Sequence, residues 1–313
     1  VSSADVFVTN YRHDALERLG FDWGTLSKRA PRLVYAHMTG YGQDGPDRDR
    51  AGYDIGAFWA RAGISVLLAQ PGGEPIGSRA GFGDHITASH GLAGILAALY
   101  AREKSGKGQL VDACLLRSGI YTVGFDIAQQ LVFGVVSPAG DRKQSLSPTV
   151  ANFEAGDGRW IWLLGVEADR HWPRLCEGLE RAELKDDPRF ASATARRENA
   201  VEMMRILDAQ FATRPLADWL ERFDAVDLWW APVNTPLEVT TDPQVLATGA
   251  IVDVPDGKGG TQKSVGSPVR FSSSDVTPRA PAPKIGEHTE KVLTELGVAA
   301  GRIVALRELR VIP

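Results

Sequence analysis

One aspartate in this sequence stands where a carboxylate could act as a nucleophile. Asp84 ends the segment Gly81–Asp84, and the residues after it follow a helical pattern. A carboxylate at the start of a helix meets unpaired backbone N–H groups and the positive end of the helix dipole, so it stays ionised. The flanking glycines let a large ligand come close. These conditions favour a carboxylate nucleophile, although an aspartate at such a place is more commonly a helix N-cap.

The helix after Asp84 is predicted from an apolar stripe. Leu92, Ile95, Leu96 and Leu99 recur at the i, i+3, i+4 and i+7 positions of one helix face. Such a stripe is typical of an amphipathic helix, whose apolar face packs on a core.

The elements before this helix predict an α/β domain. Residues 4–9 alternate as a short strand, residues 13–19 form a helix that Gly20 ends, and residues 33–38 are a nearly continuous apolar run, as in a buried parallel strand. This order indicates a doubly wound sheet. Ligands bind outside the carboxyl ends of strands in such sheets, so the glycine-rich loop over 39–46 should border the site.

The rest of the chain predicts a smaller second unit. A strand over 109–116 and a long helix to about Val136 would complete the first domain, and the Pro-, Gly- and Ser-containing stretch 137–148 is typical of a linker. An α+β region follows, and then a hairpin over 250–265. We expect a large domain, a small domain and a C-terminal part, with the boundaries 1–140, 148–235 and 236–313.

Composition narrows the classes of function. The chain has 43% apolar and 24% charged residues, which is typical of a globular protein. A net charge of −4 gives no sign of a nucleic acid or an anionic membrane as partner. No apolar run is long enough to span a membrane, and the first residues lack a signal-peptide pattern. We therefore expect a cytoplasmic protein.

Neither the histidines nor the cysteines indicate a metal site. His85 and His90 are five positions apart, whereas a spacing of four places two ligands on one helix face. Cys114 and Cys176 have no ligand spacing and are expected to be buried thiols in a reducing compartment.

A set of short motifs, in order along nearly the whole chain, points to a known family. The matching segments are Ala4–Arg12, Leu16–Gly20, Pro31–Tyr35, Gly40–Pro46, Gly52–Asp54, Gly83–Asp84, Arg102–Gln109, Asp186–Phe190, Ala231–Asn234, Asp242–Gln244 and Gly286–Thr289. Together they resemble the class III CoA-transferase family, which includes formyl-CoA transferase and carnitine CoA-transferase and is related to α-methylacyl-CoA racemase.

The resemblance implies an architecture. The family has a Rossmann-like domain and a smaller α+β domain, its C-terminal segment returns to the first domain, and two subunits form interlocked rings, so a homodimer is expected. The family normally opens with a further βαβ region, which needs about 30 residues. None of it precedes Val1, so we expect the chain to be a fragment or to be completed by another chain.

The resemblance also implies a chemistry in which acyl-CoA and a carboxylic acid are the substrates. Asp84 would attack the thioester, and the released CoA thiolate would then attack the resulting anhydride and form an aspartyl-CoA thioester. No metal is needed because each nucleophile is already an anion. Backbone N–H groups near Gly83 could stabilise the oxyanion, and Tyr53 with Asp54 matches a Tyr-acid pair of the transferases.

The family pattern assigns a group of residues to the coenzyme A molecule. Six positions should line its nucleotide end or meet its phosphates, which cations neutralise: Asn10, Tyr11, Arg12, Ala15, Arg18 and Arg50. The basic turn that contains Lys104 and Lys107 lacks the spacing of a P-loop.

Two alternatives stay open. The racemase branch carries histidine where this chain has Tyr53, and a racemase needs two proton-transferring groups on opposite faces of its substrate. Tyrosine, with an ordinary pKa of about 10, is a poor substitute, so a transferase is favoured, although His85 beside Asp84 could carry a proton. The other alternative is a catalytically incomplete fragment or subunit.

The acyl pocket is predicted to differ from that of formyl-CoA transferase. That enzyme closes a glycine run over its intermediates, whereas the corresponding residues 146–150 contain no glycine, so oxalate and formate are disfavoured as substrates. Trp229 and Trp230 could line an apolar acyl pocket, although paired tryptophans more commonly pack domains together.

Overall fold

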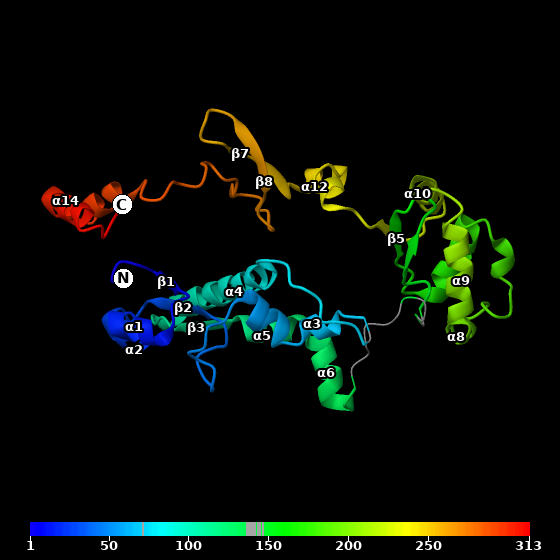
Figure 1. Ribbon diagram of the computed structural model, residues 1–313, viewed down its shortest axis with the longest axis horizontal. Helices are drawn as coiled ribbons and strands as arrows, with labels where there is room; N and C mark the ends of the chain where they lie inside the picture. Colours follow the sequence, from blue (N-terminus) through cyan, green and yellow to red (C-terminus); the bar gives the residue numbers. More distant parts are fainter. Residues whose placement is uncertain (71, 136–141, 143–144, 146) are drawn as a thin grey trace. The chain divides into compact units, whose positions relative to one another are not determined.

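Three parallel strands form the sheet that carries the site. In this computed structural model, which describes residues 1–70, 72–135, 142, 145 and 147–313, the strands are β1 (Val6–Thr9), β2 (Val34–Thr39) and β3 (Leu110–Cys114). The sheet has the order β1-β2-β3, with Phe7 opposite Tyr35 and Tyr35 opposite Leu110. The strands of this sheet confirm the predicted parallel arrangement (Figure 1).

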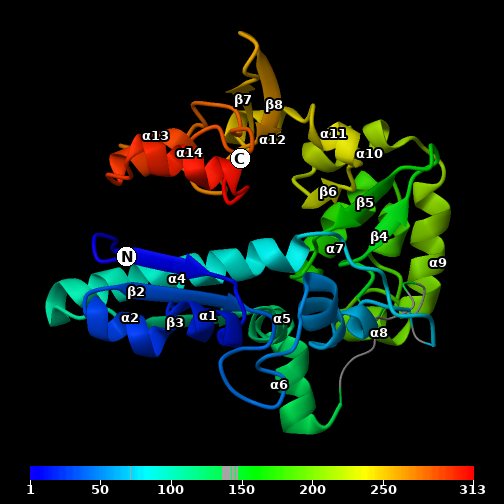
Figure 2. The same ribbon diagram turned by 60° about the vertical axis from the view of Figure 1, so that its left-hand side comes forward.

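Helices cover both faces of this sheet (Figure 2). On one face, Leu26 of α2 (Trp23–Arg29) packs with Leu33 and Tyr35, and Phe7 and Leu110 lie against this cluster. On the other face lies α4 (Phe82–Ser105), which contacts β2 and β3. This two-sided covering follows from the alternation of side chains along each strand. The structure is therefore a mixed α/β arrangement with a three-stranded parallel sheet, and the doubly wound, Rossmann-like form stays a prediction.

Helix α4 packs on the sheet through small residues. Gly91 lies close to Met38. A Cβ atom added at Gly91 would be 2.5 Å from Cε of Met38. Ala98 is also buried, whereas Leu92 and Leu96 are 56% and 57% exposed. Ile95 and Leu99 of the predicted stripe are half-buried, and the close approach of α4 to Met38 needs a residue without a side chain at Gly91.

Helix starts and ends around the sheet follow local signals. Helix α1 (His13–Leu19) ends at Gly20, whose φ of 67° is left-handed, and Asp22 caps α2 by accepting from the Thr25 N–H at 2.9 Å. The predicted long helix to Val136 is instead two helices, α5 (Leu115–Thr122) and α6 (Gly124–Phe133). The break is at Val123, whose backbone is not helical, and Gly124 follows it.

The remaining elements include a second sheet, of order β4-β5-β6, and the antiparallel hairpin β7-β8. Their bounds are β4 Asn152–Glu154, β5 Trp160–Leu163, β6 Trp230–Pro232, β7 Ile251–Pro255 and β8 Thr261–Val265. The other helices are η1 Asp54–Ala60, α3 Ile64–Leu67, α7 Ala168–Gly178, η3 Ala182–Leu184, α8 Ala193–Glu198, α9 Ala200–Phe211, α10 Leu216–Ala225, α11 Pro236–Val239, α12 Pro243–Thr248, α13 Thr289–Glu295 and α14 Ala300–Glu308. The predicted hairpin is confirmed.

The chain forms two compact units, residues 1–158 with 163–229 and residues 159–162 with 230–313. The boundaries 1–140, 148–235 and 236–313 remain predictions, as does the return of the C-terminal part to the first domain. Most of the expected linker 137–148, and Leu146 of the predicted acyl-pocket loop, lie outside the described residues. Both cysteines are buried and free, as expected.

Candidate active site

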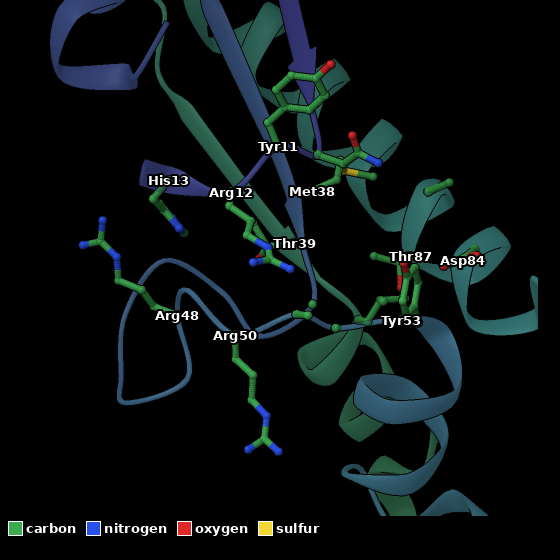
Figure 3. Close-up of a pocket in the computed structure, with 16 residues that line it drawn as sticks. Tyr11, Arg12, His13, Met38, Thr39, Arg48, Arg50, Tyr53, Asp84 and Thr87 are labelled. Carbon is green, nitrogen blue, oxygen red and sulfur yellow. The ribbon is translucent and has the colours of Figure 1, made fainter. Parts of the chain in front are cut away.

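A cavity of about 520 Å³ opens where the strands end (Figure 3). Its walls come from the residues after β1, from the end of β2 and the loop that follows, from the first turns of α4, and from Leu115 after β3. The cavity has the place that ligands take in an open α/β sheet and a size typical of small-molecule sites. The predicted Asp84, Tyr53, Asn10, Tyr11, Arg12 and Arg50 all line it.

Asp84 presents its carboxylate to this cavity from the first turn of α4. It is exposed, and within the described residues no hydrogen bond or ion pair holds its side chain. The N-cap of α4 is Gly81, whose φ of 75° is left-handed. Asp84 therefore lies inside the helix and does not cap it, which leaves both carboxylate oxygens open to a ligand.

Asp54 is a buried carboxylate near Asp84. The Gly83 N–H donates to both carboxylate oxygens of Asp54, each at 3.2 Å, and Asp54 is 9% exposed. Burial raises the pKa of Asp54 above its ordinary value, and the nearby charge of Asp84 adds to the increase. Asp54 is thus placed to hold the first turn of α4 and not to meet a substrate.

Gly83 is fixed between two neighbours. A Cβ atom at this position would lie 2.3 Å from Cγ of Phe58 and 2.4 Å from Oδ1 of Asp54. Only glycine fits without moving the first turn of α4. The Gly83 N–H was expected to donate to an oxyanion. In this structure it already donates to the Asp54 carboxylate, so an oxyanion would have to compete with Asp54 for it.

Tyr53 lies at the mouth of the cavity. It is 81% exposed and is the N-cap residue of η1, a short π-helix that begins at Asp54. Single π-turns are frequent at functional sites. The Tyr53 side chain is thus open to solvent and to a ligand in the cavity.

The cations around the cavity differ in how they are paired. Arg50 lies 3.4 Å from Asp47, and Arg48 lies 3.4 Å from Asp49. Arg12 also lines the cavity, and in the part of the chain that the structure describes no carboxylate pairs with it. Among the described arginines of the cavity wall, Arg12 is therefore the one that no salt bridge holds.

Two of the predicted CoA-binding residues lie outside the cavity wall. Arg18 is on α1, pairs with Asp14 at 3.0 Å and has a largely exposed side chain. Ala15 lies on the same helix and is half-buried. Both remain available only to a ligand that extends from the cavity over the surface of α1.

A chain of hydrogen bonds fixes the loop that carries Arg12. Gln43 donates to Nδ1 of His37 at 2.7 Å and accepts from Nε2 of His13 at 2.9 Å, and Nε2 of His37 donates to the Tyr11 carbonyl at 2.7 Å. The opposite orientation of the Gln43 amide would require a doubly protonated, buried His37. Burial lowers the pKa of His37, so the neutral ring is favoured. Sequence analysis missed this network because its members become neighbours only in the fold.

The two histidines of α4 have different surroundings. His90 is within 3.0 Å of the Ser118 hydroxyl through Nδ1, and His85 is exposed and absent from the cavity wall. No group of three metal-ligating side chains occurs within the described residues. Among the helices described, none is both long and apolar enough to cross a membrane.

Comparisons with known proteins identify the family of this chain. The family model described as CoA-transferase family III matches residues 1–289. The chain is 30% identical to (R)-2-hydroxy-4-methylpentanoate CoA-transferase of Clostridioides difficile, over all of this chain and 78% of that protein. It is 33% identical to the succinyl-CoA–L-malate CoA-transferase beta subunit of Chloroflexus aurantiacus, again over all of this chain and 78% of that protein.

Solved structures show the same fold. A CaiB/BaiF family protein from Brucella suis superimposes with a TM-score of 0.80 at 28% identity, covering 94% of this chain and 76% of that one. The matched family and the fold extend over most of the sequence and include the cavity around Asp84. The chain therefore belongs to CoA-transferase family III.

Proposed function

We propose that this enzyme moves CoA between an acyl-CoA and a carboxylic acid through a covalent intermediate on Asp84. The observation that carries the proposal is that Asp84 is the one acidic side chain among the described residues that line the cavity. An unpaired carboxylate next to a ligand-sized space is able to act as a nucleophile.

The proposed reaction needs no group beyond the two substrates. A carboxylate oxygen of Asp84 bonds to the thioester carbonyl carbon, and the carbon–sulfur bond breaks to release CoA thiolate. The thiolate then attacks the Asp84 carbonyl of the mixed anhydride, which forms an aspartyl-CoA thioester and frees the donor acid. The acceptor acid runs the same steps in reverse. Because Asp84 is exposed in the free protein, we propose that the bound substrates themselves exclude the water that would otherwise hydrolyse the anhydride.

The coenzyme A molecule is proposed to lie across the cavity with its phosphates toward Arg12 and Arg50. Asn10 and Tyr11 would border it, and its nucleotide end would continue toward Ala15 and Arg18 on α1. The relatives differ in their named substrates, including a hydroxy acid, a malate and an oxalate. We therefore propose the substrate class, acyl-CoA with a carboxylic acid, and no single pair. A homodimer and a cytoplasmic location are proposed on the family resemblance alone.

Intact-mass spectrometry tests the intermediate. The protein is incubated separately with succinyl-CoA, cinnamoyl-CoA and a branched 2-methylacyl-CoA, and then treated with hydroxylamine. We expect a hydroxamate on the peptide that contains Asp84, absent from Asp84→Asn and present in the matched variant Asp126→Asn, whose carboxyl lies on α6 away from the cavity wall.

Two outcomes would contradict the proposal. Labelling of Asp84→Asn equal to that of the wild type would place the nucleophile elsewhere. Exchange of solvent deuterium into the α-carbon of the 2-methylacyl-CoA, without any adduct, would show a racemase instead.

A further inference from the structure

The proposed chemistry leaves one charge without an evident donor. Attack by Asp84 turns the thioester carbonyl oxygen into an oxyanion, which needs hydrogen-bond donors. The Gly83 N–H at the start of α4 already donates to Asp54. We therefore look for another donor among the residues of the cavity wall.

Thr87 has a hydroxyl with no assigned function. The residue is 4% exposed and lines the cavity, and its Oγ1 atom has no hydrogen-bond partner among the described residues. Buried hydroxyls are nearly always bonded, and an unpaired one costs about 1–3 kcal/mol. Since the cavity borders Thr87, a ligand in the cavity is the natural partner.

Its position relative to Asp84 fits this role. Thr87 follows Asp84 by three residues within α4, so both side chains lie on one face of the helix. Figure 3 shows the two residues on this stretch of α4, with Tyr53 among the residues that line the same cavity. Threonine has two χ1 wells in a helix, which lets Oγ1 turn without moving the backbone.

Other hydroxyls of the wall have a hydrogen-bond partner or are less buried than that of Thr87. Thr39 accepts from the Gly42 N–H at 2.9 Å through its Oγ1 atom, which fixes the loop after β2. Tyr53 is 81% exposed, so water solvates it. Thr87 alone among these three combines burial with an oxygen that has no partner in the described chain.

We propose that the Thr87 hydroxyl is a catalytic hydrogen-bond donor to the oxyanion formed when Asp84 attacks the thioester. The inference rests on the proposed aspartyl chemistry. The O–H bond stays intact throughout: the hydrogen bond strengthens as the carbonyl oxygen gains charge and weakens when the carbon–sulfur bond breaks. The same donor serves the reverse attack by the acceptor acid.

The test is the rate of adduct formation in Thr87→Val, measured by rapid quench and intact mass with the acyl-CoA from the panel above that labels the wild type most strongly. Valine has the shape of threonine without the hydroxyl. Loss of one oxyanion donor should slow labelling about 100-fold at saturating acyl-CoA and leave the concentration for half-saturation within about threefold. Thr87→Ser, which keeps the hydroxyl, should restore most of the rate.

Two controls separate catalysis from structure. Thr122→Val removes a hydroxyl bonded to the Ser118 carbonyl on α5 and should label as the wild type does. Thr87→Val should unfold at the same or a higher urea concentration than the wild type without ligand, because it removes an unpaired buried oxygen.

The outcomes distinguish this inference from the proposed function. Labelling of Thr87→Val at the wild-type rate, with labelling lost in Asp84→Asn, would overturn the role of Thr87 alone. Absence of an adduct in the wild type would overturn the aspartyl intermediate itself. Equal loss in Thr87→Val and Thr87→Ser would show that packing and not the hydroxyl matters, which also overturns the inference.

Discussion

Replacing Asp54 tests how the nucleophile is held. Asparagine keeps an oxygen that can accept from the Gly83 N–H, whereas alanine leaves this buried N–H without the two 3.2 Å contacts it now makes. An unpaired buried donor costs about 1–3 kcal/mol. We therefore expect Asp54→Ala to lower the free energy of unfolding by about 2 kcal/mol relative to Asp54→Asn, measured by urea denaturation with equal m-values.

The pH dependence of the same pair gives an independent check. The pKa of Asp54 is raised above 3.8 by burial and by Asp84, so the folded state binds a proton more readily than the unfolded state. The stability that this proton gives is fully present below the ordinary carboxyl pKa and is lost as the pH rises through the raised one. As the pH rises from the ordinary carboxyl pKa through the raised pKa of Asp54, the free energy of unfolding of the wild type should fall relative to that of Asp54→Asn. At higher pH, the difference between the two proteins should stay constant.

Two results would refute this reasoning. Equal unfolding free energies for Asp54→Asn and Asp54→Ala would mean that the Gly83 N–H finds another partner. A wild type that gains stability relative to Asp54→Asn as the pH rises would mean that Asp54 is stabilised as an anion, contrary to its buried position beside Asp84.

Two further changes probe the walls of the cavity. Arg12→Ala should weaken CoA binding about tenfold by calorimetry, because a charge-assisted contact to phosphate is lost; an equal effect of Lys107→Ala, which removes a charge outside the cavity wall, would indicate a non-specific effect of charge. Gly52→Ala places a Cβ 2.9 Å from the Gly40 Cα, and this overpacking should lower the unfolding free energy by about 1–3 kcal/mol. Gly77→Ala, where a Cβ meets nothing within 4 Å, is its control in the same urea assay, and equal stability of the two variants would contradict the predicted clash.

Elements that depend on local signals could be predicted from the sequence. Gly20 ends α1 and Asp22 begins α2 because a left-handed glycine and an N-cap carboxylate act within one turn. The strand β2 is largely apolar because both faces of a parallel strand are covered. The cavity at the ends of β1 and β2 follows from the topology of such sheets.

The face on which α4 packs could not be predicted in the same way. Periodicity identifies the apolar stripe, and two of its leucines are more than half exposed while Gly91 and Ala98 are buried. Helix-to-sheet contact here is decided by how closely two backbones approach, as the 2.5 Å distance from an added Gly91 Cβ to Met38 shows. Hydrophobicity scales do not record this demand for small side chains.

The different roles of the Asp54 and Asp84 carboxylates also depend on the tertiary structure. In the sequence, Tyr53 and Asp54 form one pair and Gly83 and Asp84 another, and each acid could be a cap or a reactant. The fold buries Asp54 against the Gly83 N–H and leaves Asp84 exposed in the cavity wall. Asp54 occupies the helix terminus and Asp84 is left free, and the proposed donor for the developing oxyanion, Thr87, lies one turn farther along α4.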